Sequence, residues 1–363
     1  MRIHCQLALA LPLIGLVASS APAQAPVWKG KIVQENGLPV VMNPKEPLFV
    51  SPAPTFRPDW QIGGPGASAD ESPLLFAQIA ISKSGQVLIP DVKSCDIKIF
   101  DGNGRFLRRF GRKGQGPGEF TVLGGIALDE SKGELLALDF MKVSIFKLDG
   151  TFVRSQATRE RWNDAAIDSE GRVLAAVSFR DGGLVRRVLK GFDAALKSEA
   201  VIHEWTSEDE RSYNPFLPPG AWGIDGRGNV YCGDSTTYAI EVYDSSHRPV
   251  REIRKDDDPV RIPADIREKA RKTVPPGLRS DIPEFYPAFR RILVDEKGFL
   301  LVQTSRREGG EIIYDLFDDR GRYLAPIAVP FFPLAYRDEK LYSREQDAEG
   351  FLLAKRYALN WNR

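Results

Sequence analysis

The chain has 363 residues, and its 50 Lys and Arg residues nearly balance its 49 Asp and Glu residues, which gives a formal net charge of +1. This balance argues against a nucleic-acid partner, because such proteins present a basic face to phosphates. The length and the 42% hydrophobic content allow a large buried core, within the range of one all-β domain.

The first 23 residues have the pattern of a secretory signal peptide. Arg2 precedes an apolar run over residues 7–17, and the small residues of the sequence APA at 21–23 follow it. The apolar run is too short to span a bilayer comfortably, and no other stretch has the composition of a membrane helix. We therefore expect cleavage after Ala23 and a protein of the periplasm or the extracellular medium, with no membrane span.

The next segment, residues 24–55, is rich in proline, and we expect it to pack outside the main domain as an extended strap. Residues 56–76 then show an outer strand, a Gly-Pro-Gly loop and an apolar run. The same pattern recurs at 110–120, where the loop GRKGQGPGEF lies between two strand pairs. Such a loop is expected to connect the outer strand of one sheet to the inner strand of the next.

A repeated unit, an apolar run followed by an Asp-x-x-Gly turn and a second apolar run, organises the remaining chain. Copies of the unit occupy residues 79–91, 126–139, 166–177, 223–234 and 292–302, with a degenerate copy at 343–354. In a short hairpin loop the Asp accepts backbone hydrogen bonds and the Gly takes a positive φ. A second hairpin follows most copies, so each unit supplies four antiparallel strands.

Six four-stranded units that close into a ring form a six-bladed β-propeller. The sixth unit reaches the end of the chain before its fourth strand, and the strand around Trp60–Ile62 can supply it. The sequence thus predicts an all-β propeller over 56–363 whose ring is closed by the N-terminal strand. One insertion, residues 256–287, contains a helix signal from Pro263 to Val274. This helix is either a lid or a surface decoration.

The stretch GRKGQGPGEF, the turn units and the segment NGLPVVMNPKEPLF (36–49) resemble the NHL-repeat-like six-bladed propellers of exported bacterial proteins. The resemblance covers nearly the whole mature chain. It implies the propeller fold and says little about function, because propellers host unrelated activities.

Three carboxylates, Asp91, Asp139 and Asp234, each end the second strand of a blade on the face where the connecting loops gather. Carboxylates that converge there could hold a cation or an amine. The alternative is that each one caps its own following loop through hydrogen bonds.

The first residues of the inner strands should face the central channel near the same surface. The candidate ligand-binding residues of this kind are Gln78, Asp164, Trp222, Arg290, Tyr336 and Arg337. A mixture of aromatic, amide, carboxylate and guanidinium groups suits a polar or anionic small molecule or a peptide. The alternative is that these side chains fill the pore and pair with one another.

The residue types support an enzyme less well than they support a binding protein. Lyases of related propellers usually depend on histidine, and the mature chain has only His203 and His247. A gluconolactonase-like hydrolase or lyase would need calcium in the channel, with Asn163 and the nearby carboxylates as ligands. We predict no catalytic residue and no metal ligand, and keep the calcium enzyme as the alternative.

The favoured function is an exported, monomeric binding module for a small polar molecule, peptide or protein at the loop face. Cys95 and Cys232 fall on opposite sides of the predicted ring, so we expect no disulfide between them.

Overall fold

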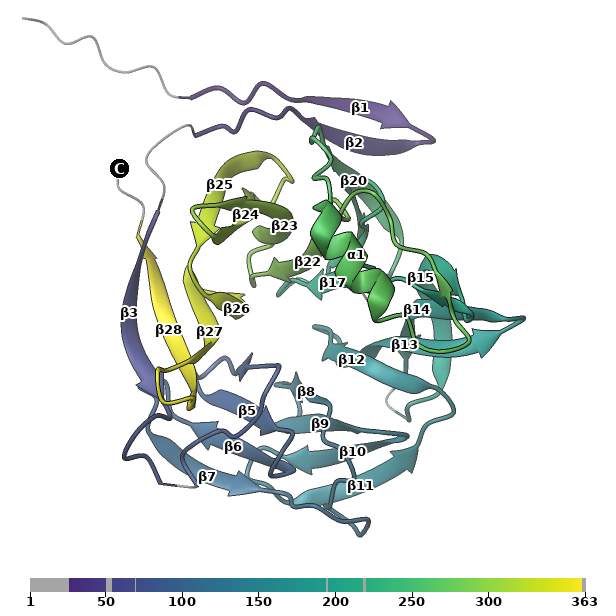
Figure 1. Ribbon diagram of the computed structural model, residues 1–363. Coiled ribbons are helices and arrows are strands. Elements are labelled where there is room, and N and C mark those ends of the chain that lie inside the picture. The colour runs from purple at the N-terminus through teal and green to yellow at the C-terminus, as the bar shows by residue number, and fades with distance from the viewer. Residues whose placement is uncertain (1–25, 50–53, 69, 194, 218–219, 361–363) are drawn as a thin grey trace, which may run out of the picture.

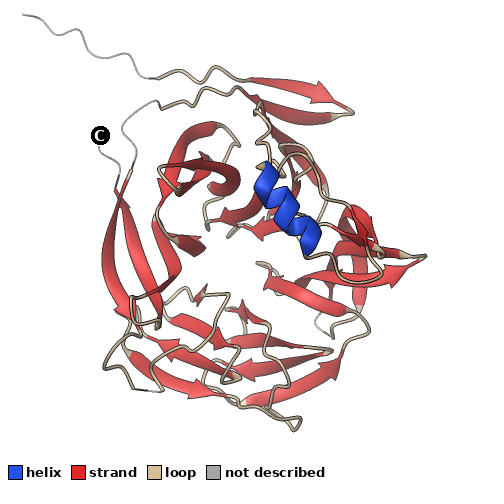
Figure 2. Cartoon of the chain, viewed as in Figure 1, coloured by secondary structure: helices blue, strands red, loops and turns tan. Residues whose placement is uncertain are grey.

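The computed structural model describes residues 26–49, 54–68, 70–193, 195–217 and 220–360, so the predicted signal peptide lies outside the described residues. Six sheets surround a central channel (Figure 1), and the described chain consists almost entirely of strands and loops with one helix (Figure 2). The structure therefore confirms the six-bladed β-propeller.

The first three blades each run from an inner to an outer strand in chain order. Blade one contains β4 (Ala80–Ile81), β5 (Val87–Asp91), β6 (Asp96–Phe100) and β7 (Phe106–Phe110). Blade two contains β8 (Gly125–Asp129), β9 (Glu134–Asp139), β10 (Lys142–Lys147) and β11 (Phe152–Ala157). Blade three contains β12 (Arg161–Ile167), β13 (Val173–Asp181), β14 (Leu184–Phe192) and β15 (Ser198–Asp209).

The last three blades follow the same plan, and blades four and six also recruit strands from the N-terminal segment. Blade four contains β17 (Ala221–Ile224), β18 (Val230–Asp234), β19 (Ala239–Tyr243) and β20 (Pro249–Lys255), extended by β2 (Leu38–Asn43) and β1 (Lys31–Glu35). Blade five contains β22 (Phe289–Val294), β23 (Leu300–Glu308), β24 (Glu311–Phe317) and β25 (Tyr323–Val329). Blade six contains β26 (Phe332–Arg337), β27 (Lys340–Gln346), β28 (Leu352–Asn360) and β3 (Thr55–Ile62).

The ring is closed by an antiparallel pair between the two ends of the chain. β3 pairs with β28, with Trp60 opposite Arg356 and Ile62 opposite Ala354. The Arg356 side chain also bonds Asp59 at 2.8 Å and the carbonyl of Gly102 in blade one at 2.8 Å. The predicted non-covalent closure by the N-terminal strand is confirmed.

The described part of the predicted strap is a hairpin that adds to a blade. Asn36 and Gly37 both have positive φ, 50° and 80°, as a two-residue hairpin turn requires. β2 runs parallel to β20 and becomes the fifth strand of blade four. The Asn43 side chain then donates to the carbonyl of Gly321 and accepts from the N–H of Tyr323, which ties blade four to blade five.

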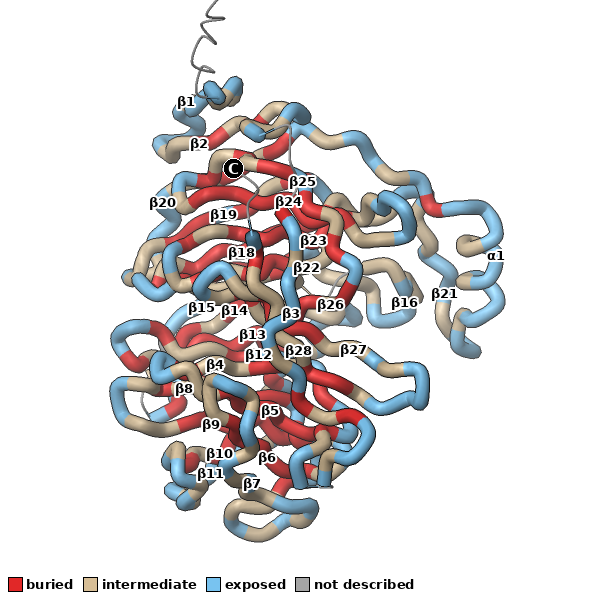
Figure 3. The backbone as a smooth tube through the Cα atoms, turned by 90° about the vertical axis from the view of Figure 1, so that its left-hand side faces the viewer, coloured by how far each residue is buried: buried red, intermediate tan, exposed pale blue. Residues whose placement is uncertain are grey.

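Apolar side chains fill the spaces between neighbouring blades, and the buried segments in Figure 3 lie inside the stacked sheets. Trp162 of blade three packs with Leu138 of blade two, for example, and Phe76 of blade one packs with Tyr342 of blade six. Each blade thus buries both faces, which explains the continuous apolar runs in the second strands. Cys95 and Cys232 are buried in two different clusters and are free thiols.

The insertion between blades four and five contains the helix α1 (Ala264–Lys272), close to the predicted range. No residue of α1 is buried. The insertion also contains β21 (Arg279–Ser280), which pairs in parallel with β16 (Ser212–Tyr213) from the loop between blades three and four. Figure 3 shows α1, β16 and β21 projecting together from one side of the ring.

Candidate functional site: the channel at the loop face

A cavity of about 800 Å³ occupies the centre of the ring and is lined by the inner strands of all six blades. Five of the predicted ligand-binding residues line it, namely Gln78, Asp164, Trp222, Arg290 and Tyr336. The other four, Asp91, Asp139, Asp234 and Arg337, lie outside the lining.

Three inner strands carry a β-bulge at the point where they meet the cavity, and in β26 the pairing with β27 shifts between Pro333 and Ala335, so that Leu334 is the extra residue. In β12 the pairing with β13 shifts between Trp162 and Asp164, so that Asn163 is the extra residue. In β22 the pairing with β23 shifts between Phe289 and Arg291, so that Arg290 is the extra residue. Bulges redirect side chains and are common next to binding sites. Blades three and five therefore both use a β-bulge to place a side chain, Asn163 or Arg290, on the channel wall.

The two neighbouring arginines of β22 have different surroundings. Arg291 donates to the carbonyls of Pro333 and Leu334, each at 3.0 Å, and its guanidinium lies 5.6 Å from the ring centre of Phe332. Burial lowers the pKa of Arg291 from its ordinary value. Among the described residues, Arg290 has no hydrogen bond or ion pair, and it lies on the channel wall. Arg291 thus joins blade five to blade six, whereas Arg290 is available to a ligand.

Asp164 is the carboxylate of the described channel wall. Its side chain is exposed to the channel, and its carboxylate accepts the N–H of Ala165 at 2.9 Å. Protein atoms crowd it on its other sides, and this burial raises the pKa of Asp164 to about 6, although the Ala165 amide and the positive charge of Arg291 oppose the shift. The pKa of Asp164 thus lies well above the ordinary value of an aspartate.

Trp222 and Gln303 complete the polar half of the channel. Trp222, on β17 between β12 and β22, is partly exposed, and its indole N–H has no hydrogen-bond partner within the described chain. Gln303 of β23 lies opposite Arg291 in the strand register. Gln303 was not among the predicted residues, although the strand register across the hairpin at Asp295 places it opposite Arg291. Tyr336 lies on the channel wall but is nearly buried, and burial raises its pKa.

Gln78 and Arg337 join blades to each other. Gln78 donates to the carbonyl of Ile126 at 2.9 Å and accepts the N–H of the same residue at 2.7 Å, which connects blades one and two. Arg337 donates to the carbonyl of Ile81 at 2.6 Å and connects blades six and one. Gln78 thus lines the channel with its amide already paired, as the pore-filling alternative expects.

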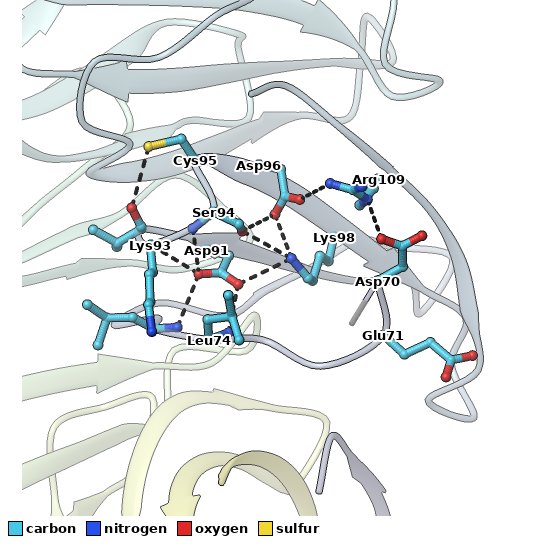
Figure 4. Close-up of polar contacts among 12 residues, drawn as sticks. Asp70, Glu71, Leu74, Asp91, Lys93, Ser94, Cys95, Asp96, Lys98 and Arg109 are labelled. Carbon is cyan, nitrogen blue, oxygen red and sulfur yellow. Dashed lines mark hydrogen bonds and ion pairs between the residues drawn. The ribbon is translucent and has the colours of Figure 1, made fainter. Parts of the chain in front are cut away.

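Asp91 holds the loop in front of its own blade (Figure 4). Its carboxylate accepts the N–H of Leu74 at 2.7 Å and of Leu75 at 3.1 Å, and it also binds the Lys98 ammonium at 3.2 Å. Lys98 in turn contacts Asp96 at 2.7 Å, and all three charged side chains are fully buried. Burial opposes ionisation of Asp91, but the Leu74 amide and Lys98 outweigh it and lower its pKa.

Asp139 and Asp234 also bind backbone amides. Asp139 accepts the N–H groups of Thr121 at 2.9 Å, Val122 at 2.7 Å and Phe140 at 2.8 Å. Asp234 accepts the hydroxyl of Thr206 at 2.6 Å and the N–H of Thr236 at 3.0 Å. Each of the three carboxylates thus accepts an amide of the loop that follows its strand, from Lys93, Phe140 or Thr236, as the capping alternative expects, and also accepts donors from other segments; none of the three lines the cavity.

The loop that contains β16 and the insertion that contains β21 contact each other on the loop face. Arg279 of β21 donates its N–H to the carbonyl of Arg211 at 2.7 Å, and the Ser212 hydroxyl donates to Asp281 at 3.2 Å. These bonds join the loop after blade three to the insertion after blade four. In Figure 1 the helix α1 overlaps the region of β17 and β22. The insertion and the β16 loop are thus joined on the side of the ring where β20 leads into β22.

The described residues contain no group of three or more His, Cys, Asp or Glu side chains with the arrangement of a metal site. His203 lies in β15 and bonds the Tyr243 hydroxyl at 3.1 Å, while His247 lies in the turn after β19, so both are remote from the channel lining. Within the described ranges, no helix is both long and apolar enough to cross a membrane.

Comparisons with known proteins agree with this architecture. A family model described as a 6-bladed beta-propeller matches residues 70–165, which contain blades one and two. No curated protein matches the chain.

Several solved structures share the fold at low sequence identity. A protein described as exported, from Bacteroides fragilis, is 13% identical with a TM-score of 0.59, over 89% of this chain and 100% of its own. A member of the DUF4221 family from Bacteroides vulgatus is 11% identical with a TM-score of 0.52, over 85% of this chain and 99% of its own. A gluconolactonase from Xanthomonas campestris is 12% identical, over 85% of this chain and 99% of its own. Its TM-score of 0.47 is too low for the likeness to bear on activity. The chain is thus similar to six-bladed β-propellers in fold, and its function must be argued from its own channel.

Proposed function

We propose that the protein is an exported, non-catalytic binding protein that holds the carboxylate of a small polar molecule or a peptide in its channel. The observation that carries the proposal is the position of Arg290, which a β-bulge turns to the channel wall without a partner among the described residues. A charged side chain in a cavity that lacks a counter-ion is a candidate ligand contact.

The charges of the channel favour an anion. Its described lining contains two cations, Arg290 and Arg291, against the single carboxylate of Asp164. A guanidinium binds a carboxylate through two parallel N–H donors, and this pairing is stronger where water is partly excluded. The Trp222 indole and the amides of Asn163 and Gln303 offer stacking and hydrogen bonds to the rest of such a ligand.

The alternative, a calcium-dependent hydrolase or lyase, has less support. A calcium ion takes six to eight oxygen ligands, several of them carboxylates. The described channel wall offers Asp164 alone, and the positive charge of Arg291 lies near enough to affect its ionisation. A divalent cation at this position would face two arginines.

Export is supported by the sequence pattern of residues 1–23 and by the description of the propeller from Bacteroides fragilis as an exported protein. The NHL-like character of the repeat and a monomeric state belong to the same proposal.

Calorimetric titration of the mature protein with phenylacetate and with phenylacetamide tests the proposal. The two probes have the same shape, and only the first carries a charge. We expect phenylacetate to bind and the amide to bind at least tenfold more weakly, since a charge-assisted pair contributes about 1.5–3 kcal/mol.

Arg290→Met should remove the preference for phenylacetate, whereas Arg320→Met should leave it unchanged. Arg320 lies in an exposed turn of the same blade and uses only its backbone N–H, which Asp318 accepts. Equal binding of both probes, or full phenylacetate binding by the Arg290→Met variant, would overturn the proposal.

A further inference from the structure

Five exposed apolar side chains gather on the loop face of blades one and two. They are Leu74, Leu75, Val122, Phe140 and Met141, each between 38% and 59% exposed. Single exposed apolar residues are ordinary, but a group on two neighbouring blades at one face indicates an interaction surface. We name this group the apolar ledge.

The backbone of the ledge is fixed by two buried carboxylates. Asp91 binds the N–H groups of Leu74 and Leu75, and Asp139 binds those of Val122 and Phe140. Burial opposes ionisation of Asp139, but the amides that it accepts outweigh this effect and lower its pKa. A ledge on a fixed backbone loses little conformational entropy when a partner covers it.

The ledge borders the channel on the side opposite to Arg290. Leu75 lies two residues before Ala77, and Val122 lies two residues before Gly124; both of these later residues line the cavity. In a ring of six blades, blade two stands across from blade five, which carries Arg290. An apolar surface and an unpaired guanidinium therefore face each other across the channel mouth.

We propose that the ligand is a short extended peptide whose C-terminal carboxylate binds Arg290 and whose apolar side chains rest on the apolar ledge. This inference rests on the proposed function and names its ligand class. An extended chain covers about 3.3 Å per residue, so four or five residues span roughly 13–17 Å. The amide oxygen of Asn163, which lines the channel, can accept from peptide groups along such a chain, while the amide N–H of Asn163 already donates to the Ser178 hydroxyl at 3.0 Å.

The two surfaces that the ligand would contact, the apolar ledge and Arg290, indicate its chemical class. The five side chains of the ledge are uncharged and suit contacts with aliphatic or aromatic side chains, whereas the guanidinium of Arg290 suits an anion. A free peptide C-terminus next to apolar residues combines both in one molecule. A second copy of this chain or a lipid surface would cover the ledge without supplying a carboxylate to Arg290.

The test uses the peptide acetyl-Ala-Leu-Phe-Ala-Leu as the free acid, its C-terminal amide, and a free acid in which Ser replaces the Leu and Phe residues. Titration of the mature protein should show binding of the free acid, with both altered peptides at least fivefold weaker. Phe140→Ser and Val122→Ser should each weaken the free acid by about three- to fivefold. Val153→Ser is the matched control, because Val153 is similarly exposed on the outer strand of the same blade, and it should have no effect.

Two results would overturn the inference. In the first, the ledge variants bind the free acid as well as the unaltered protein does. If phenylacetate still binds through Arg290 in that case, the proposed function stands and only the peptide assignment fails; if phenylacetate also fails to bind, both fail. In the second, sedimentation shows a dimer that Phe140→Ser dissociates, which would assign the ledge to a second copy of the chain.

Discussion

Two clusters of opposite charges in this propeller differ in how completely their groups are paired. In blade one, Lys98 lies between Asp91 and Asp96, and the remaining lone pairs of both carboxylates accept backbone, hydroxyl or guanidinium donors. In the channel, Asp164 and Arg290 have almost no partners of their own. The first cluster is closed and structural, whereas the second is open to a ligand. The difference indicates that pairing, more than charge or position in the repeat, separates the charged side chains that stabilise the blade from those that stay available to a ligand.

The largest expected effect comes from removing the cation of the fully paired cluster in blade one. Lys98→Met leaves Asp91 and Asp96 buried with less positive charge, and loss of one partner from a buried pair costs about 3–5 kcal/mol. We expect a loss of this size in the free energy of unfolding, measured by urea denaturation. Lys93→Met changes an exposed lysine on the adjacent loop and should cost less than about 0.5 kcal/mol. A Lys98→Met protein of unchanged stability would show that this cluster does not stabilise the fold.

The open cluster should respond to pH where the closed one does not. Burial raises the pKa of Asp164 to about 6, so a fall in pH from 7.5 to 5.5 protonates it and removes the one negative charge of the described channel wall. The attraction of Arg290 for a carboxylate then increases, and we expect phenylacetate to bind about two- to threefold more tightly at pH 5.5. The direction follows from the sign of the shift: the charged form of Asp164 is the one that repels the ligand.

Asp164→Asn provides the control for this titration. The variant should bind phenylacetate with the higher affinity at both pH values and should lose the pH dependence. A pH effect that persists in Asp164→Asn would assign the titration to another group. Weaker binding at pH 5.5 in the unaltered protein would contradict the sign of the argument.

The comparison also explains which parts of the molecule could be predicted from sequence. The turn units fix the blades because each Asp-x-x-Gly hairpin is a local structure, and the missing strand of blade six identified β3 as its partner. The repeat also locates the channel ends of β12 and β22, where Asp164 and Arg290 lie. Local patterns thus establish which residues reach the loop face.

Contacts between distant segments could not be predicted in this way. The Asn36-Gly37 dipeptide signals a hairpin, but nothing local shows that β2 pairs with β20 some two hundred residues later. Likewise, the repeat places Asp91 and Asp139 at the correct face but does not say that the amides of Leu74 and Val122 lie within hydrogen-bond distance. The direction of a side chain depends on donors that belong to another part of the chain.

The smallest expected effect concerns calcium. If the channel is an anion site, a thermal melt of the mature protein should have the same midpoint in EDTA as in excess calcium, because only a ligand bound to the folded state raises the midpoint. The positive side chains Arg290 and Arg291 disfavour a divalent cation next to Asp164. A calcium-dependent rise of several degrees, abolished by Asp164→Asn, would instead support the calcium enzyme and would make the two clusters alike, each a carboxylate paired with a cation. An unchanged midpoint together with phenylacetate binding that depends on Arg290 would leave the open cluster as an anion site, because the cation that balances the ligand is then supplied by the protein.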